Sequence, residues 1–348
     1  MKQSYRRWSV GLLAGFLAVL TLSAGTVWAV DPFFHYHDPD PEGEVWFDER
    51  YQNAGLLRSQ QYETVLMGTS LAENYRPFWF DVFYKTSTVK TAFPNGGFHE
   101  FSQALDYAFE RQDVKRVIFG LDPNILARPA AQAPDQLPAY LYDDDPWNDG
   151  AYLFSKDVLL RAGYALAEKE RGRTCPLQDA FMWDGTESFS REDALAGYDR
   201  PDDPAAQPLP EDAFSAACAE NLAVVTGWLE SHPDTQFVFY LAPYSILFWD
   251  KMQRLGETDA MFALLRRTAE TLLPYENAEL HCFLDDMDVI LDLDNYADHI
   301  HAAGRVTYAM AEALPGGAYR LTPENARQRL DALHEFVVNY DYEPLFQP

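Results

Sequence analysis

The chain has 348 residues, of which 47% are hydrophobic and 15% aromatic, and its 54 acidic against 27 basic residues give a formal net charge of -27 at pH 7. This composition supports the core of one large domain or two small ones. A surface so acidic repels the phosphate backbone, so the composition argues against a nucleic-acid-binding protein and no nucleic-acid partner is expected.

The first 30 residues carry a membrane-targeting signal, because three basic residues precede an apolar run that ends at Val30. A membrane-spanning helix needs about 20 apolar residues, and a basic flank stays in the cytoplasm. The segment could also be a signal peptide with a poor cleavage site at positions 27–29. Since the run is longer than the usual hydrophobic region of a signal peptide, we predict an uncleaved, single-pass anchor over residues 1–30, with the rest of the chain outside the cytoplasm. A secreted protein is the alternative.

Beyond the anchor, strand and helix patterns alternate. Short apolar segments predict strands at residues 63–68, 89–94, 114–121, 235–241 and 278–284. Helices are predicted at residues 98–111, 211–231, 257–273, 302–314 and 323–339. Strands separated by helices imply a parallel sheet covered on both faces, so we expect residues 31–348 to form one three-layer α/β/α domain of flavodoxin-like layout. The proline-rich segment 123–210 contains only one clear helical stretch, 156–171, and is expected to be an insertion over the site.

The chain contains three cysteines, Cys175, Cys218 and Cys282. An exported protein can form disulfides, and the first two cysteines fall in the same middle region, so we hypothesise that they pair. Cys282 lies in a predicted apolar strand and is expected to remain a buried thiol.

Two short motifs about 230 residues apart suggest chemistry. Ser70 follows directly after the first predicted strand, where a parallel sheet binds ligands. Near the end of the chain, Asp298 precedes His301 by three residues. A serine hydroxyl becomes a useful nucleophile when an imidazole takes its proton and a carboxylate orients that imidazole. We therefore predict a catalytic set of Ser70, His301 and Asp298, although Ser70 and Asp298 could instead be simple helix caps.

These motifs resemble those of the SGNH hydrolase superfamily, whose members carry a serine block, a glycine block, an Asn block and a final Asp-x-x-His block. Ser70, Gly97 and the segment 298–301 correspond to the first, second and last blocks. The resemblance covers nearly the whole chain from Asp31. It is closest to membrane-anchored proteins of bacterial cell envelopes, in which an anchor leads into a segment like residues 31–37 and a Gly-Thr-Ser-x-x-Glu-Asn block.

The chain departs from the SGNH pattern at two places. Thr69 stands where the serine block has Asp, and the third block reads Gly-Leu-Asp-Pro-Asn, so that Asp122 rather than Asn124 is nearer the position of the usual oxyanion donor. The amides of Ser70 and Gly97 are expected to hold the oxyanion, because glycine lets the backbone approach a ligand closely. Candidate side chains for oxyanion or substrate binding are Asn74, Asn95, Asp122 and Asn124.

The resemblance implies a serine-dependent esterase or O-acyltransferase that acts on an acylated envelope polysaccharide. The expected partners are this glycan, the membrane and a candidate membrane acyltransferase, and neither a cofactor nor a metal is expected. The alternative is a non-catalytic SGNH-like protein that binds a polymer or scaffolds an export complex. Tyr244, after the fourth predicted strand, either belongs to a turn set by Pro243 or contacts substrate.

Overall fold

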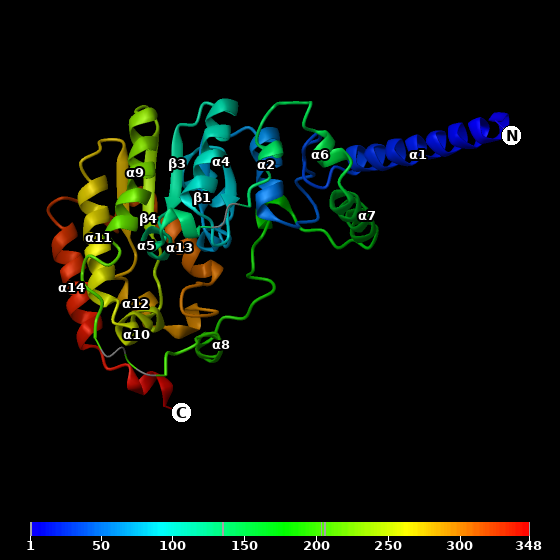
Figure 1. Ribbon diagram of the computed structural model, residues 1–348. Coiled ribbons are helices and arrows are strands. Elements are labelled where there is room, and N and C mark those ends of the chain that lie inside the picture. Colours follow the sequence, from blue (N-terminus) through cyan, green and yellow to red (C-terminus); the bar gives the residue numbers. More distant parts are fainter. Residues whose placement is uncertain (1, 134–135, 203, 205–206, 348) are drawn as a thin grey trace. The chain divides into compact units, whose positions relative to one another are not determined.

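The computed structural model describes residues 2–133, 136–202, 204 and 207–347 (Figure 1). The chain forms two compact units, which are described separately. Unit 1 extends to Gln60 and also includes Leu137–Ala180, while unit 2 contains Gln61–Gln136 and the chain from Phe181 onward. Part of the predicted insertion therefore belongs with the N-terminal segment.

Unit 1 begins with the N-terminal helix α1 (Lys2–Val30). Its other helices are α2 (Glu49–Ser59), α6 (Gly150–Leu153) and α7 (Lys156–Glu170), and both α6 and α7 pack against α1. Within the described part of the chain, α1 is the one helix long and apolar enough to cross a membrane, over the 26 residues Tyr5–Val30. A signal sequence would pass the same test.

The last turn of α1 is part of the core of unit 1. Val27 is fully buried, and Asp31, with a positive φ of 47°, directly follows the helix. The Asp31 carboxylate accepts backbone N–H groups from His35, Tyr36 and His37 at 2.6–3.0 Å, as well as the Tyr152 hydroxyl at 2.7 Å. Such a carboxylate fixes the direction in which the chain leaves the helix, because it satisfies several backbone donors at once.

Unit 2 contains a six-stranded sheet in the order β2-β1-β3-β4-β5-β6. The strands are β1 (Thr64–Gly68), β2 (Thr88–Ala92), β3 (Arg116–Gly120), β4 (Gln236–Leu241), β5 (Ala278–Cys282) and β6 (Arg320–Leu321). The first five are parallel, and β6 pairs antiparallel with β5. The central strands are buried along almost their whole length, as expected when helices cover both faces of a parallel sheet.

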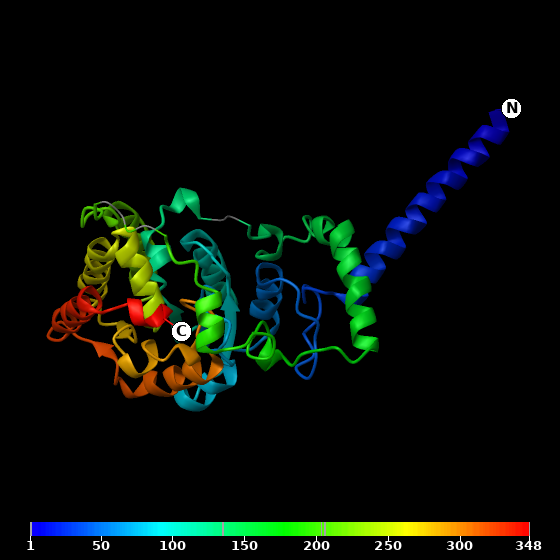
Figure 2. The ribbon, with the colours of Figure 1, turned by 90° about the horizontal axis from the view of Figure 1, so that it is seen from below.

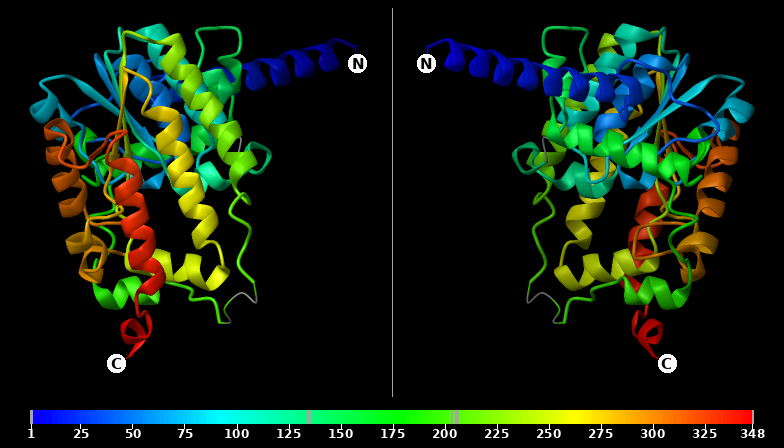
Figure 3. Two further views of the ribbon diagram at one scale, coloured as in Figure 1. Left: turned by 90° about the vertical axis from the view of Figure 1, so that its left-hand side faces the viewer. Right: turned by 90° about the vertical axis from the view of Figure 1, so that its right-hand side faces the viewer.

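The long helices of unit 2 pack in two groups, on the two sides of the sheet (Figure 3). One group contains α3 (Pro77–Tyr84) and α13 (Gly304–Ala313). The other contains α4 (Phe98–Arg111), α9 (Ser215–Ser231), α11 (Thr258–Leu272) and α14 (Ala326–Asn339). Shorter helices follow the strand ends, namely α5 (Pro123–Ala127), α8 (Arg191–Ala196), α10 (Ile246–Leu255) and α12 (Met287–Ile290).

The predicted mixed α/β architecture is confirmed, and the five predicted strands and five predicted helices are all present. The helix at residues 98–111 has the predicted ends, and the other elements differ by a few residues at one or both ends. The edge strand β6 is antiparallel, which corrects the expectation of a wholly parallel sheet. The helices α2, α3 and α10 and the strand β6 were not predicted from the sequence.

The three cysteines are free thiols, so the hypothesised bond between Cys175 and Cys218 is not formed. Cys218 is fully buried on α9 in unit 2, whereas Cys175 belongs to unit 1, where its backbone bridges to Glu44. Cys282 ends β5 and is fully buried, as predicted, and its burial raises the pKa of its thiol to about 12.

Candidate active site

Ser70 lies at the carboxyl end of β1, where the chain leaves the sheet. The strand ends at Gly68, and Thr69 caps the short 3-10 helix η1 (Ser70–Ala72) by accepting the Leu71 N–H through its hydroxyl at 3.5 Å. Ser70 is half-buried. The first N–H groups of a helix have no partner inside it, so the Ser70 amide is available to a ligand at this turn.

His301 and Asp298 lie in the loop that leads into α13. The loop is closed by an antiparallel bridge between Tyr296 and Ala302, and the Ala297 amide donates to the His301 carbonyl at 3.0 Å. The His301 Nε2 atom is 2.8 Å from Ser70 Oγ. On the other side of the ring, His301 Nδ1 is 2.6 Å from Asp298 Oδ2. The three predicted catalytic side chains are therefore joined by a continuous series of hydrogen bonds, although Ser70 and His301 are 231 positions apart in the sequence.

Asp298 is held as a carboxylate. Its Oδ1 atom accepts the backbone N–H groups of Ile300 and His301, each at 2.8 Å, while Oδ2 faces the imidazole. Burial raises the pKa of Asp298, but the hydrogen bonds and the attraction of His301 outweigh this effect and bring the pKa to about 2. An ionised Asp298 requires the proton of a neutral His301 to sit on Nδ1, which leaves Nε2 free to accept the Ser70 proton.

The neighbouring His299 has a different environment. Its Nε2 atom is 3.5 Å from Lys251 Nζ, and its ring lies beside Tyr198. Burial and the nearby Lys251 charge lower the pKa of His299 to about 4. His299 is therefore neutral at pH 7.

Two residues from the predicted insertion, Trp183 and Asp184, hold the His301 loop in place. The Trp183 ring meets the His301 ring edge-on, with centroids 4.6 Å apart and an interplanar angle of 84°. Asp184 Oδ1 accepts the Gly304 N–H at 2.7 Å, at the first residue of α13. A Cβ atom at Gly304 would lie 1.9 Å from the Asp184 carboxylate, so this contact requires glycine.

The Asn74 side chain connects its own segment to the segments that carry Ala302 and Trp183. Its Nδ2 atom donates to the Ala302 carbonyl at 3.1 Å, and its Oδ1 atom accepts the Trp183 amide at 3.0 Å. Asn74 is buried. Its amide therefore supports the loops that carry His301 and Trp183.

Asp122 joins the carboxyl ends of β1, β3 and β4. Its carboxylate accepts hydrogen bonds from the Thr69 hydroxyl at 3.2 Å, from the backbone N–H of Asn124 at 2.9 Å and from the Tyr244 hydroxyl. Burial raises the pKa of Asp122, and these hydrogen bonds act in the opposite direction. Tyr244 is fully buried, so it does not contact substrate from the surface. The Asn124 side chain donates to the Tyr244 hydroxyl at 3.4 Å, a long bond that leaves Asn124 near this network.

The glycine block takes part in a separate set of contacts. The Gly97 amide points to Glu100 Oε2 at 3.4 Å, at the start of α4. Asn95 has a positive φ of 53°, which asparagine tolerates better than most residues. Its Oδ1 atom accepts a hydrogen bond from Arg128 Nη1 at 2.5 Å, and Arg128 also binds the Gly96 carbonyl. The Gly97 amide and the Asn95 side-chain oxygen are therefore both engaged in contacts of their own.

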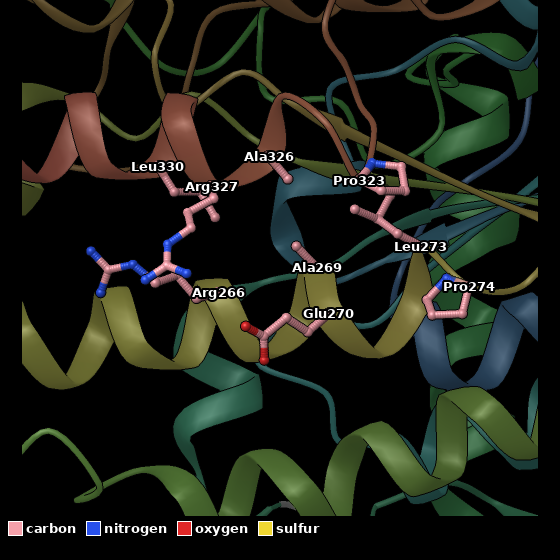
Figure 4. A pocket seen from close by; sticks show the side chains of 9 residues that line it. All are labelled: Arg266, Ala269, Glu270, Leu273, Pro274, Pro323, Ala326, Arg327 and Leu330. Atoms are coloured by element: carbon pink, nitrogen blue, oxygen red, sulfur yellow. The ribbon is translucent and has the colours of Figure 1, made fainter.

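A cavity of about 10 Å³, which gives room for about one water molecule, is lined by Leu71, Trp183, Ile300 and Ala302 among other residues and by none of the triad residues. A larger groove of about 550 Å³ lies between α11 and α14 (Figure 4) and contains none of the triad residues. Within the described residue ranges, no group of three or more His, Cys, Asp or Glu side chains is arranged to hold a metal ion.

Comparison with known proteins gives one weak likeness. No protein-family model and no curated protein sequence matches the chain. A solved structure from Streptococcus pneumonia, described as a proposed platelet activating factor, aligns with 77% of this chain and 88% of its own. The sequences are 12% identical and the TM-score is 0.38, so this similarity assigns neither a family nor an activity.

Proposed function

We propose that this protein is a serine-dependent esterase or O-acyltransferase of the SGNH type that acts outside the cytoplasm on acyl groups of an envelope polysaccharide. The observation that carries the proposal is the hydrogen-bonded chain from Ser70 Oγ through His301 to an ionised Asp298. A helix cap alone would not require the imidazole of His301 at 2.8 Å from the serine oxygen.

The reaction follows from this geometry in two stages. Ser70 Oγ attacks the ester carbonyl as its proton passes to His301 Nε2, and Asp298 stabilises the imidazolium that forms. The carbon–oxygen bond to the leaving alcohol then breaks, and His301 donates the proton to that alcohol. Water or a sugar hydroxyl next attacks the acyl-serine while His301 removes its proton. The bond between the acyl carbon and Ser70 Oγ then breaks, and His301 returns the proton to Oγ, which restores Ser70 and yields an acid or a new ester.

The tetrahedral intermediate needs donors for its negative oxygen. The Ser70 amide at the start of η1 is one candidate. Gly97 and Asn124 are candidates for a second donor. The Gly97 N–H would have to leave Glu100, to which it makes a long hydrogen bond at 3.4 Å, whereas the Asn124 side-chain NH2 has a second N–H besides the one that points to Tyr244. The loss of one such donor costs about 3 to 4 kcal/mol of transition-state stabilisation, so the choice between them is measurable.

The strand order supports the SGNH assignment. The order β2-β1-β3-β4-β5 is that of flavodoxin-like doubly wound sheets, which bind ligands where the strand order reverses, between β1 and β3. Ser70 and Asp122 follow these two strands and are linked through Thr69.

The N-terminal helix narrows the proposed compartment. The basic residues at the start of α1 favour placement of the chain beyond Val30 outside the cytoplasm, if α1 spans the membrane. The polysaccharide acceptor and a membrane acyltransferase partner rest on the sequence resemblance.

One observation favours the second candidate function, a non-catalytic polymer-binding or scaffold protein. The amide of Asn74 is used in loop contacts, and the Gly97 amide is turned toward Glu100. A site without a complete set of oxyanion donors would bind an ester but turn it over slowly.

A fluorophosphonate probe tests the choice between these functions, with the full chain in detergent. The proposal predicts labelling at Ser70 that is lost in Ser70→Ala and His301→Ala. A matched control, Ser190→Ala, changes a serine that caps α8 and should keep full labelling. Two results together would favour the scaffold function. The folded wild-type protein would take up no probe, and the wild type and Ser70→Ala would bind an acylated glycan equally well.

A further inference from the structure

The helix α7 in unit 1 has apolar residues on its exposed side, although the helix lies at the surface. Its buried residues, which are Val158, Ala162, Ala165 and Glu168, recur at helical spacing and face the interior. Leu160 and Tyr164 lie on the opposite side, one turn apart, and are 64% and 55% exposed. A helix with apolar residues on both sides needs a second apolar environment.

The position of α7 along α1 indicates what that environment is. The shielded residues of α1 fall on one face near its C-terminal end, at Leu20, Ser23, Ala24 and Val27. Both α6 and α7 pack against α1. Small residues such as Ser23 and Ala24 allow close helix contact. Leu20 is ten residues before the end of α1, a distance of about 15 Å along the helix.

The length of α1 places this contact at the level of the bilayer surface. The apolar segment Tyr5–Val30 has 26 residues, or about 39 Å, whereas the hydrocarbon core of a membrane is about 30 Å thick. If α1 spans, its last ten residues extend through the outer part of the core into the headgroup layer. A helix that packs against those residues is then at the membrane interface as well.

The orientation of α7 and the residue types around it are both consistent with a position at the membrane interface. It crosses the C-terminal end of α1 and does not continue alongside it (Figures 1 and 2). Exposed aromatic residues occur in α1, in α7 and in the segments on either side of α6, namely Trp28, Tyr164, Trp147 and Phe154. Tyr and Trp are enriched at membrane–water interfaces.

The charge of this segment also differs from that of the whole chain. Residues 156–173 contain five basic side chains against three acidic ones, although acidic residues outnumber basic residues 54 to 27 in the full sequence. Two of the basic side chains, Lys156 and Arg173, are 84% and 70% exposed. An interfacial helix combines such basic residues with apolar residues that enter the acyl boundary.

We propose that α7 is an interfacial helix, which inserts Leu160 and Tyr164 into the outer surface of the lipid bilayer beside the exit of α1. The proposal rests on the spanning of α1 and is independent of the chemistry proposed for Ser70. It would make unit 1 a membrane-seated platform rather than a freely tethered segment.

Nitroxide accessibility in lipid nanodiscs tests this proposal with the full chain. In a Cys175→Ser background, which removes the one thiol that is not buried, single labels are placed by Leu160→Cys and Tyr164→Cys. Leu13→Cys in the apolar part of α1 is the lipid control, and Glu42→Cys, exposed elsewhere in unit 1, is the water control.

At both α7 positions, relaxation by oxygen should exceed relaxation by a water-soluble nickel chelate several-fold, as at Leu13→Cys, with the opposite order at Glu42→Cys. Higher accessibility to the nickel chelate at both α7 positions would place the helix in water and overturn the proposal. Low accessibility to both reagents would indicate a protein contact and overturn it equally. A water-like result at Leu13→Cys would remove the spanning helix on which the proposal rests.

Discussion

Asp298→Asn tests how the triad works, because it keeps the shape of the side chain and removes its charge. In the folded protein the pKa of Asp298 falls from 3.8 to about 2. The side chain is 26% exposed, so this shift corresponds to about 2.5 kcal/mol of stabilisation of the carboxylate.

Loss of this stabilisation in the transition state alone would slow turnover by about 60-fold. The effect should be larger, because the new amide can place an N–H against His301 Nδ1 and force the ring into the tautomer that cannot accept the Ser70 proton. In serine proteases the corresponding change costs about 10⁴-fold in kcat. We therefore expect a loss between these limits for hydrolysis of 4-nitrophenyl acetate.

The same substitution has a second readout in acid. A carboxylate with a depressed pKa contributes stability that is present above its unfolded pKa and is lost as the pH falls through its folded pKa. The wild type should therefore lose about 2.5 kcal/mol more stability than Asp298→Asn between about pH 5 and pH 1 in urea denaturation. The control Asp292→Asn changes a carboxylate that caps the 3-10 helix η5 (Leu293–Asn295) and should leave turnover unchanged. Wild-type turnover by a folded Asp298→Asn protein would refute the proposed role of this carboxylate.

Two further predictions concern the support of the site and the thiols. Gly304→Ala should destabilise unit 2 by about 1.5 to 3 kcal/mol in urea denaturation and reduce turnover, because the added Cβ displaces Asp184 from its charge-assisted hydrogen bond. Gly163→Ala, in an open position on α7, should instead leave stability equal or higher, and equal effects of the two substitutions would contradict the clash. In the folded protein a maleimide should modify Cys175 and spare Cys282, whose burial raises its thiol pKa to about 12, and modification of both in peptide mapping would contradict the observed burial.

The hydrogen-bonded set of Ser70, His301 and Asp298 could be predicted because each of its parts is a local pattern. A serine after an apolar strand, and a carboxylate three residues before a histidine, are visible without knowledge of the loops. The strand and helix alternation also predicts that Ser70 lies at the carboxyl edge of the sheet. The contact between Ser70 and His301 confirms that the two segments that carry these residues meet there.

The surroundings of the triad could not be predicted in the same way, because they depend on how loops cross. Trp183 and Asp184 reach His301 and Gly304 from a segment with no regular pattern. The roles of Asn74 and Asn95 as loop supports likewise depend on partners that are 228 and 33 residues away. The helix α3 was missed since its aromatic sequence, from Pro77 onward, has the composition of a strand.

The most direct test of the central claim is detection of the acyl-enzyme on Ser70. The full chain in detergent is mixed with 4-nitrophenyl acetate, quenched in acid within the first turnovers, and digested for peptide mass spectrometry, with Ser70→Ala in parallel. The account predicts one acetyl group on the peptide that contains Ser70, and neither this adduct nor sustained turnover in Ser70→Ala. Equal turnover by wild type and Ser70→Ala, with no acetyl group on Ser70, would contradict it.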